Sequence, residues 1–270
     1  MRYASPVAAH ALGRSAAAAV CFRHYERLQV TAIVKVTLGF AHHGEIKLVP
    51  PKPLVATEVH YGNSPLRSIR ACGELAPALP RVDVVFVGDA HAPEGEPVTH
   101  MPVRLAVASD ARVLFDKRLL IVGDRSRRRD GSVTEPEPFT KMPIVYERSL
   151  GGPGVRQNPL GTGVGGAKEH LPNIAYPDPR LAEATACYGP IGVSWPIRKT
   201  LLGNGSRRAL EAEIAEIPDD FVWSYFQSAP EDQQVDELPE RSWIVLEGLN
   251  ARSPMLQMRL PTMRASARLY

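Results

Sequence analysis

Apolar and polar residues alternate along several short segments of the chain. In residues 28–40 an apolar side chain occupies every second position, and Ile33 is the exception to the alternation. Successive side chains of a strand point to opposite faces, so this period predicts a strand with one buried apolar face. A second strand is expected at residues 45–49, because the prolines that follow cannot donate to a ladder of hydrogen bonds.

Other segments predict further strands. Residues 82–88 are almost wholly apolar and indicate an interior strand covered on both faces, in which Asp83 needs a polar partner. Residues 103–108 alternate, with Arg104 on the outer face. Residues 112–115 and 118–122 flank Asp116 and Lys117, which we interpret as a two-residue hairpin turn. Further strands are expected at residues 144–147, 243–246 and 256–260.

Helical patterns are scarce and short. Residues 181–186 favour a turn or two of helix, and residues 207–215 have a helical composition that ends before Pro218. The predicted fold class is therefore mainly β, with antiparallel sheets packed in a sandwich-like arrangement, long ordered loops rich in glycine and proline, and few short helices. We expect one β-rich domain over residues 1–270. A subdivision into an N-terminal sheet region, 1–134, and a loop-rich region, 135–270, is the finer alternative.

Residues 135–198 form the most distinctive stretch of the sequence. Glycine and proline are frequent there, which is typical of irregular backbone. A flexible linker would not need the aromatic, charged and amide side chains that lie among them. We therefore predict an ordered loop pinned to the β framework. The anchoring residues are Tyr146, Glu147, Arg148, Asn158, Asn173, Tyr188 and Trp195.

Composition narrows the class of protein. The 32 basic and 29 acidic residues give a net charge of +3, which is too balanced to indicate a nucleic-acid partner. The three cysteines lie far apart, which favours reduced thiols and a cytoplasmic protein. The apolar run at residues 16–22 is too short for a membrane span, so no membrane insertion is expected.

Motifs for catalysis and for cofactors are weak. The eight histidines lack metal-ligand spacing, and the glycines at 161–166 lack the lysine and serine of a phosphate loop. We therefore expect no catalytic residue, no metal and no cofactor. Asp89 and His91, directly after a predicted strand, are the candidates for the alternative of a hydrolase-like enzyme. The basic run at residues 125–129 indicates a solvated hairpin tip, with phosphate or acidic-partner binding as the alternative.

An ordered set of motifs spans most of the chain and resembles one bacterial family. It comprises IVKVTLGF (33–40), LAPALPRVDVVFVGDAHAP (75–93), IVGDR (121–125), PEPFTKMPIVYERSLGG (136–152), NPLGTG (158–163), LPNIAYP (171–177), YGPIGVSWPIR (188–198), IPDDF (217–221) and APEDQQ (229–234). These segments, in this order, resemble the domain family of unknown function DUF2169. Relatives continue beyond the position of Tyr270, so the resemblance also implies a chain truncated at its C-terminus.

The resemblance implies a function without catalysis. Proteins similar to this family are associated with type VI secretion, where they are implied to act as adaptors or chaperones that load an effector toxin onto the spike. An enzyme using Asp89 and His91, or an envelope- or carbohydrate-binding β module, are the alternatives. The chemistry of the motif side chains favours architectural or recognition roles. The candidate residues are Asp83, Asp124, Arg125, Tyr146, Glu147, Arg148, Asn158, Asn173, Trp195, Arg198, Asp232 and Gln233.

Individual roles are expected for some of these residues. Asp83, Asp124, Arg125, Glu147 and Arg148 are candidates for buried charge-assisted pairs that hold loops to strands. Asp232 and Gln233 can hydrogen-bond loop backbone, and Trp195 is expected to cover an edge of the core.

Overall fold

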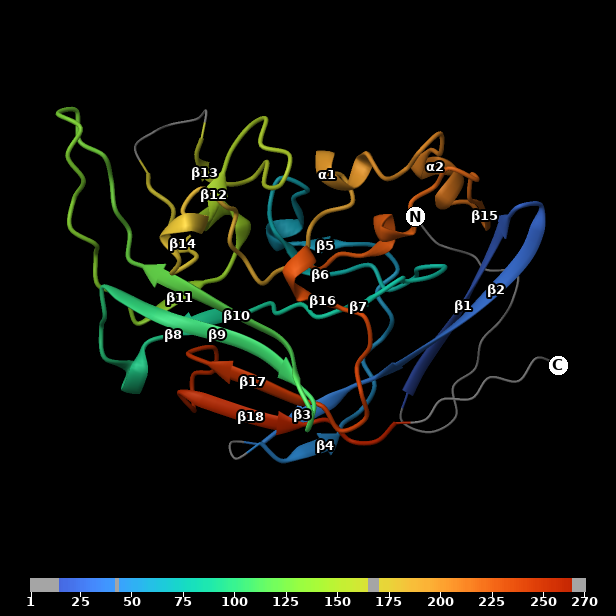
Figure 1. Ribbon diagram of the computed structural model, residues 1–270, viewed down its shortest axis with the longest axis horizontal. Coiled ribbons are helices and arrows are strands. Elements are labelled where there is room, and N and C mark those ends of the chain that lie inside the picture. The colour runs from blue at the N-terminus through green and yellow to red at the C-terminus, as the bar shows by residue number, and fades with distance from the viewer. Residues whose placement is uncertain (1–14, 42–43, 165–169, 264–270) are drawn as a thin grey trace.

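The prediction of a mainly β fold is confirmed. The computed structural model describes residues 15–41, 44–164 and 170–263, and most regular structure there is strand (Figure 1). Several antiparallel sheets are present, together with two parallel pairings, and the α-helices of these residues are short. The helical elements are α1 (Pro196–Lys199), α2 (Arg207–Leu210) and the 3-10 turns η1 (Tyr61–Asn63), η2 (Pro93–Gly95), η3 (Tyr146–Arg148), η4 (Pro179–Leu181), η5 (Trp223–Phe226) and η6 (Glu231–Gln233).

A five-stranded antiparallel sheet forms the larger part of the fold. Its order is β14-β10-β9-β17-β18, with β9 at the centre (Figure 1). This sheet contains strands from both sides of residue 134, and so does the smaller three-stranded sheet. The chain is therefore not divided into separate sheets at that position. The strands are β9 (His100–Ala108), β10 (Val113–Val122), β14 (Ile174–Ala175), β17 (Trp243–Glu247) and β18 (Met255–Arg259).

The two faces of β9 show the usual separation of apolar and polar side chains. Val103 and Leu105 are buried in the main core, whereas Arg104 points to the other face. There the Arg104 guanidinium donates to both oxygens of Asp116 on β10, at 2.7 and 2.9 Å, and to Glu247 on β17 at 2.7 Å. The apolar face therefore builds the core, while the polar face links three strands.

The main core lies between this sheet and the irregular stretch that follows it. Leu119 and Ile121 of β10 are fully buried there, and so is Tyr188 from the loop. The Tyr188 hydroxyl lies 3.1 Å from the carbonyl oxygens of both Val103 and Lys117, so a buried polar atom is satisfied by sheet backbone. The core therefore fixes the loop on the sheet.

A three-stranded sheet extends away from the main core on the right of Figure 1. It has the order β15-β1-β2, where β1 (Ser15–His24) and β2 (Arg27–Val36) form a long hairpin and β15 (Ile214–Glu216) pairs parallel to β1. The hairpin tip is Tyr25 and Glu26, which have φ of +48° and +60°. Positive φ at both tip residues is the conformation that a two-residue turn needs to match the twist of its strands.

A second, smaller core lies beside this sheet. Phe22 of β1 and Ala215 of β15 pack with Phe221 and Tyr225. The ring of Trp223 meets Phe22 edge-on at 5.9 Å between centroids. Within the described residues, buried side chains therefore form two clusters, one on each large sheet.

The prediction that the apolar face of residues 28–40 is buried is wrong for β2. Leu28, Val30, Val34 and Val36 are 55, 43, 48 and 38% exposed. The opposite face lies against the body of the protein, where the Lys35 ammonium bonds Glu74 and the Pro53 carbonyl oxygen. The polar side chains of β2 find their partners inside, so the apolar side chains face outward. The strand also breaks at Thr37.

The remaining strands form two-stranded ladders. They hold loops rather than build layers. The pairs are β3 (Leu38–Phe40) with β4 (Ile46–Leu48), β5 (Val59–His60) with β6 (Ile69–Ala71), β7 (Val82–Asp83) with β16 (Gln234–Val235), β8 (Asp89–His91) with β11 (Lys141–Pro143), and, in parallel, β12 (Leu150–Gly151) with β13 (Thr162–Gly163).

Several local predictions are corrected. Asp116 and Lys117 do not form a turn, because both lie within the continuous strand β10, which meets β9 through a turn at 109–112. Residues 84–88 are not part of a strand. Residues 144–147 run into the 3-10 turn η3, and the helix expected at 207–215 ends at Leu210 and gives way to β15. None of the helices in the described part of the chain has the length and hydropathy of a membrane-spanning segment.

Candidate functional site

The stretch 135–198 has little regular structure, yet buried side chains fix the part of it that the structure describes. It crosses the upper left of Figure 1 through β11, η3, β12, β13 and β14 and then reaches α1. Residues 165–169, which include the last two glycines of the run at 161–166, lie outside the described residues. The hydrogen bonds of its side chains distinguish a flexible linker from an ordered loop with a fixed surface.

Glu147 and Tyr146 hold the start of the loop to a distant segment. The Glu147 carboxylate accepts from the Ser68 amide at 3.0 Å and from the Ser68 hydroxyl. The Ser68 hydroxyl oxygen accepts in turn from the Tyr146 amide at 2.9 Å. The buried Tyr146 hydroxyl donates to the Gly189 carbonyl at 3.0 Å. Glu147 therefore acts through hydrogen bonds to neutral donors and not through the expected buried ion pair.

Asn158 ties the middle of the loop back to its beginning. Its side chain is fully buried, and Nδ2 donates to the carbonyl oxygens of Tyr146 and Leu150 at 2.9 and 3.1 Å. Its Oδ1 accepts from the Leu160 amide at 3.2 Å. Gly151 and Gly161 approach the Asn158 side chain so closely that a Cβ at either position would lie within 2.8 Å of it. The glycines thus admit the amide that closes the loop.

Arg148, Asp124 and Asn173 form a polar ring at the edge of β10. The Arg148 guanidinium donates to Asp124 at 2.7 Å and to the Asn173 side-chain oxygen at 3.0 Å. The Asn173 amide nitrogen donates to Asp124 at 2.8 Å and to the Val122 carbonyl at 3.0 Å. The Arg148 and Asp124 side chains are 32 and 56% exposed, so this ion pair is partly solvated and not buried as expected.

Arg125 is also bound to backbone. Its guanidinium donates to the Pro172 carbonyl at 2.7 Å, and within the described chain its buried Nε has no hydrogen-bond partner. Burial lowers the pKa of this group from its usual value. Beyond Arg125, the basic run forms a hairpin tip, with Arg127 bridged to Val133 and the Arg128 amide bonded to the Ser132 carbonyl.

Lys117 is an anchor that the sequence analysis missed. Its ammonium is buried beneath the loop and donates to the Cys187 carbonyl, Asp232 and the Gln233 side-chain oxygen, at 2.8 to 2.9 Å. Gln233 is fully buried and donates to the carbonyl oxygens of Val84 and Tyr188 at 2.7 and 3.0 Å. Burial lowers the pKa of Lys117, and the charge of Asp232 opposes that shift. The sequence offered one signal for this anchor, a lysine between the apolar segments 112–115 and 118–122.

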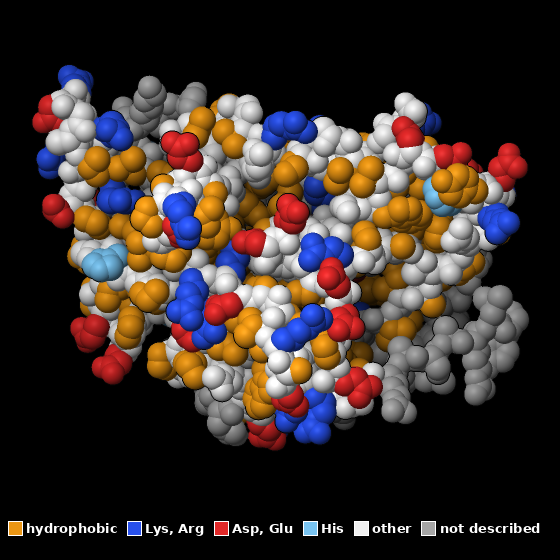
Figure 2. All heavy atoms as spheres, in the orientation of Figure 1, with side chains coloured by type: hydrophobic (Ala, Val, Ile, Leu, Met, Phe, Trp, Pro, Cys, Tyr) orange, Lys and Arg blue, Asp and Glu red, His pale blue; other side chains and the backbone are white. Residues whose placement is uncertain are grey.

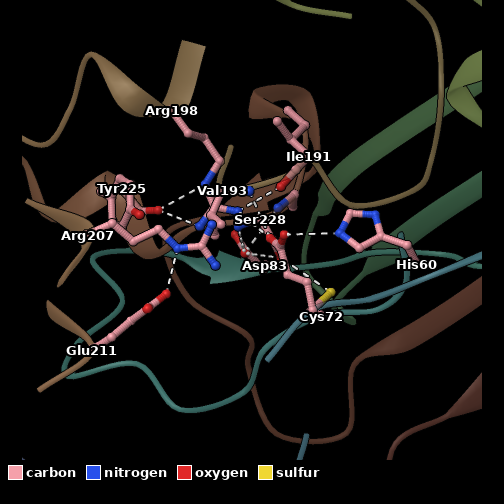
Figure 3. Close-up of polar contacts among 12 residues, drawn as sticks. His60, Cys72, Asp83, Ile191, Val193, Arg198, Arg207, Glu211, Tyr225 and Ser228 are labelled. Carbon is pink, nitrogen blue, oxygen red and sulfur yellow. Dashed lines mark hydrogen bonds and ion pairs between the residues drawn. The ribbon is translucent and has the colours of Figure 1, made fainter. Parts of the chain in front are cut away.

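The loop ends at a junction between the two sheets, shown in Figure 3. Arg198 is 6% exposed and donates to the Ile191 carbonyl at 2.7 Å and to the Tyr225 carbonyl at 3.0 Å. Its guanidinium also lies 3.4 Å from the Glu58 carboxylate, which accepts from the Val193 amide at 2.9 Å. Burial raises the pKa of Glu58, and Arg198 opposes that shift.

Asp83 and Trp195 complete this junction. The Asp83 carboxylate accepts from the Gln227 side chain at 3.1 Å and from the Ala229 amide at 3.1 Å, so its partners are neutral donors. Trp195 is 3% exposed and meets Tyr146 edge-on at 4.7 Å, so it lies inside the main core and not at its edge. Glu58 and Arg198 line a cavity of about 80 Å³.

Asp89 and His91 lie on β8, which pairs with β11. The Asp89 carboxylate lies 3.1 Å from the Lys141 ammonium on the neighbouring strand β11. Neither residue lines the cavity above Glu58, nor a second hollow lined by Arg127 and His170. Within residues 15–41, 44–164 and 170–263, no three histidine, cysteine or acidic side chains are grouped as metal ligands would be. The face seen in Figure 2 carries interspersed acidic and basic side chains.

Comparison with known proteins identifies a family but no described activity. The profile of the family described as "Uncharacterized protein conserved in bacteria (DUF2169)" matches residues 25–270. The chain belongs to this family. No curated protein and no solved structure matches it.

The DUF2169 match covers every residue proposed as a candidate site. The structure places ten of these twelve residues in three groups rather than in one pocket, while Arg125 binds the Pro172 carbonyl and Trp195 lies in the main core. Tyr146, Glu147, Arg148, Asn158 and Asn173 hold the loop together with Asp124, and Asp232 and Gln233 hold it to Lys117. Asp83 and Arg198 lie at the junction of the two sheets. The sequence motifs therefore mark the anchors of a loop surface.

Proposed function

We propose that this protein is a non-enzymatic adaptor or chaperone that binds a secreted effector toxin and helps to load it onto the spike of a type VI secretion system. The type VI secretion context of this proposal, with loading in the cytoplasm, comes from the resemblance to DUF2169 proteins. The shape and chemistry of the loop at residues 135–198 supply the physical support for protein binding.

One observation carries the proposal. The anchoring amides are bonded within the protein, since both Asn158 and Gln233 use their oxygen and their nitrogen on internal partners. A loop fixed in this way presents a preformed surface, and preformed surfaces lose less conformational entropy when they bind. Groups used as anchors are not free to act on a substrate. This arrangement favours recognition over catalysis.

The loop also offers contact groups to a partner. Val164 and Leu181 are 41 and 43% exposed on its outer side. Apolar side chains on an ordered surface are common contact points in protein interfaces. The partners that we propose for these two side chains are the effector toxin and a spike protein of the type VI apparatus.

The test is co-expression with the effector and spike proteins encoded nearby, followed by affinity purification and size exclusion. A stoichiometric complex is expected, and Leu181→Arg or Val164→Arg should weaken it. Val222→Arg is the matched control, because Val222 is 45% exposed but lies outside the loop. Asp89→Asn should leave the complex intact. Failure of the wild-type chain to bind any of these proteins would overturn the proposal.

A further inference from the structure

Strand β2 presents an apolar row at an edge of its sheet, where no other strand of the described residues pairs with it. In the order β15-β1-β2 one edge strand is the short β15, and the other is β2, paired with β1 over ten successive positions without a bulge. The outward side chains are Leu28, Val30, Ala32, Val34 and Val36. All five residues are exposed.

This edge lacks most of the features that keep edge strands apart. Natural edges are commonly blocked by proline, by a bulge or by outward charges, because open backbone groups pair readily with another strand. β2 contains no proline, and the row from Leu28 to Val36 carries no charge. Its one internal lysine, Lys35, is turned inward and lies 2.6 Å from the Glu74 carboxylate. The open edge therefore combines strand backbone with an apolar face.

The sequence of β2 is complementary to itself. Residues directly opposite each other in an antiparallel pair share a face. If two copies pair about Ala32, Leu28 meets Val36, Val30 meets Val34, and Ala32 meets Ala32 of the second copy. Each of the five outward residues then has an apolar side chain directly opposite. The smallest of them lies on the two-fold axis, where identical side chains must meet.

Charge placement agrees with the same register. Pairing about Ala32 sets Lys35 opposite Gln29 and Arg27 opposite Thr37, so no like charges face each other. A shift by one residue would place apolar side chains opposite inward ones. A shift by two residues would leave part of the row without an apolar side chain of the other copy directly opposite. The register about Ala32 satisfies both the apolar and the charged positions.

We propose that two copies of this chain associate through antiparallel pairing of their β2 strands about Ala32. The two three-stranded sheets then form one continuous sheet across a two-fold axis, and the two apolar rows lie side by side on the same face of that sheet. This inference does not rest on the adaptor function, since it concerns a different surface from the loop at 135–198. Pairing by one strand covers less surface than a standard interface, so the dimer is expected to dissociate on dilution.

The first test measures the native mass of the full chain by light scattering or sedimentation over a range of concentrations. The expected mass at high concentration is twice the chain mass of 29.5 kDa. The double variant Val30→Lys with Val34→Lys should be monomeric, because the introduced ammonium groups face each other across the axis. Val113→Lys with Val222→Lys, which changes exposed valines elsewhere, should remain dimeric.

Charge exchange tests whether the two β2 strands face each other in the dimer. A second variant, Val30→Glu with Val34→Glu, should also be monomeric alone. Mixing it with the lysine variant should restore a dimer, since each introduced carboxylate then faces an introduced ammonium. The thermal midpoints of the variants serve as the folding control, and they should stay near that of the wild type because both positions are exposed in the monomer.

Disulfide trapping tests the register. Ala32→Cys should form a crosslinked dimer under oxidising conditions, because this position meets itself on the axis. Val36→Cys alone should not crosslink, since it faces Leu28 of the other copy, whereas a mixture of Val36→Cys and Leu28→Cys chains should. The wild-type chain provides the background for Cys21, Cys72 and Cys187.

Three results would overturn the proposal. The first is a wild-type chain that stays monomeric at every accessible concentration. The second is a dimer that survives the paired lysines with its mass unchanged. The third is a monomer whose β2 row instead binds an effector or spike protein in a complex that the paired lysines abolish, which would assign the strand to that partner.

Discussion

The five-stranded sheet and the three-stranded sheet use the same alternating pattern in opposite ways. In β9 the apolar residues Val103 and Leu105 face the core, and Arg104 faces outward to Asp116 and Glu247. In β2 the apolar row faces outward, and Lys35 faces inward to Glu74. The periodicity of a strand therefore fixes which residues share a face. The partners available on each side decide which face is buried.

The two regions also differ in how their polar groups are used. Between the main sheet and the loop, Lys117 and Gln233 bind buried backbone carbonyls and each other, so these polar groups strengthen the packing of the loop. At the junction beside the three-stranded sheet, Glu58 and Arg198 lie next to a cavity. The first region is a closed scaffold. The second leaves a small cavity beside its buried ion pair.

Removing the central cation should give the largest effect. Lys117→Ala leaves the buried Cys187 carbonyl and Gln233 side-chain oxygens without this donor, whereas Asp232 is 43% exposed and keeps the Tyr176 hydroxyl, so the unfolding free energy should fall by about 2–4 kcal/mol. Arg118→Ala is the matched control on the same strand, because the Arg118 side chain is 61% exposed. Urea unfolding of both variants measures the difference. A loss at Lys117 no larger than that at Arg118 would show that the network does not hold the loop.

A pair of valines compares the two sheets directly. Val103→Ala creates a cavity in the main core and should cost about 1–3 kcal/mol, whereas Val34→Ala on β2 should change the stability of the monomer by less than about 0.5 kcal/mol. Val103 is 1% exposed and Val34 is 48% exposed. Chemical unfolding at low protein concentration isolates the monomer. Equal losses would mean that the β2 row is covered within the chain.

The polar ring at the loop edge should contribute less. Arg148→Ala removes the bonds to Asp124 and Asn173, and since the pair is partly solvated the expected loss is about 1 kcal/mol. Arg156→Ala provides the control, because Arg156 is exposed on the same loop and makes one long bond, of 3.4 Å, to Thr200. Thermal melting compares the two. An unchanged midpoint for Arg148→Ala would remove this ring from the list of loop anchors.

The junction should give the smallest effect, visible as a pH dependence. The pKa of Glu58 in the folded chain is raised above 4.5, chiefly by burial, so this carboxyl favours folding most when it is protonated. Its contribution should be complete below pH 4.5 and decline as the pH rises through the folded pKa. The unfolding free energy of the wild type should therefore fall relative to Glu58→Gln over that range. A difference independent of pH would contradict the raised pKa.

The sequence predicted the fold class and much of the strand content, because alternation and β-branched residues are local signals. It also identified the residues that anchor the loop, since amides and charges among glycines need partners. It did not predict the role of Lys117, whose ligands lie 70 and more residues away along the chain. Nor could it reveal the outward face of β2, because Glu74 and Pro53 are brought to the inner side only by the tertiary fold.

The parallel pairing of β1 with β15 sets an order of events during synthesis. Cys21 and Ile214 are neighbours in the sheet but are 193 residues apart in the chain. At a ribosomal rate of about 5–20 residues per second, the β1–β2 hairpin waits roughly 10 to 40 seconds for its third strand. Both edges of the hairpin are open during that time. The nascent chain is therefore most vulnerable to mispairing before β15 has emerged.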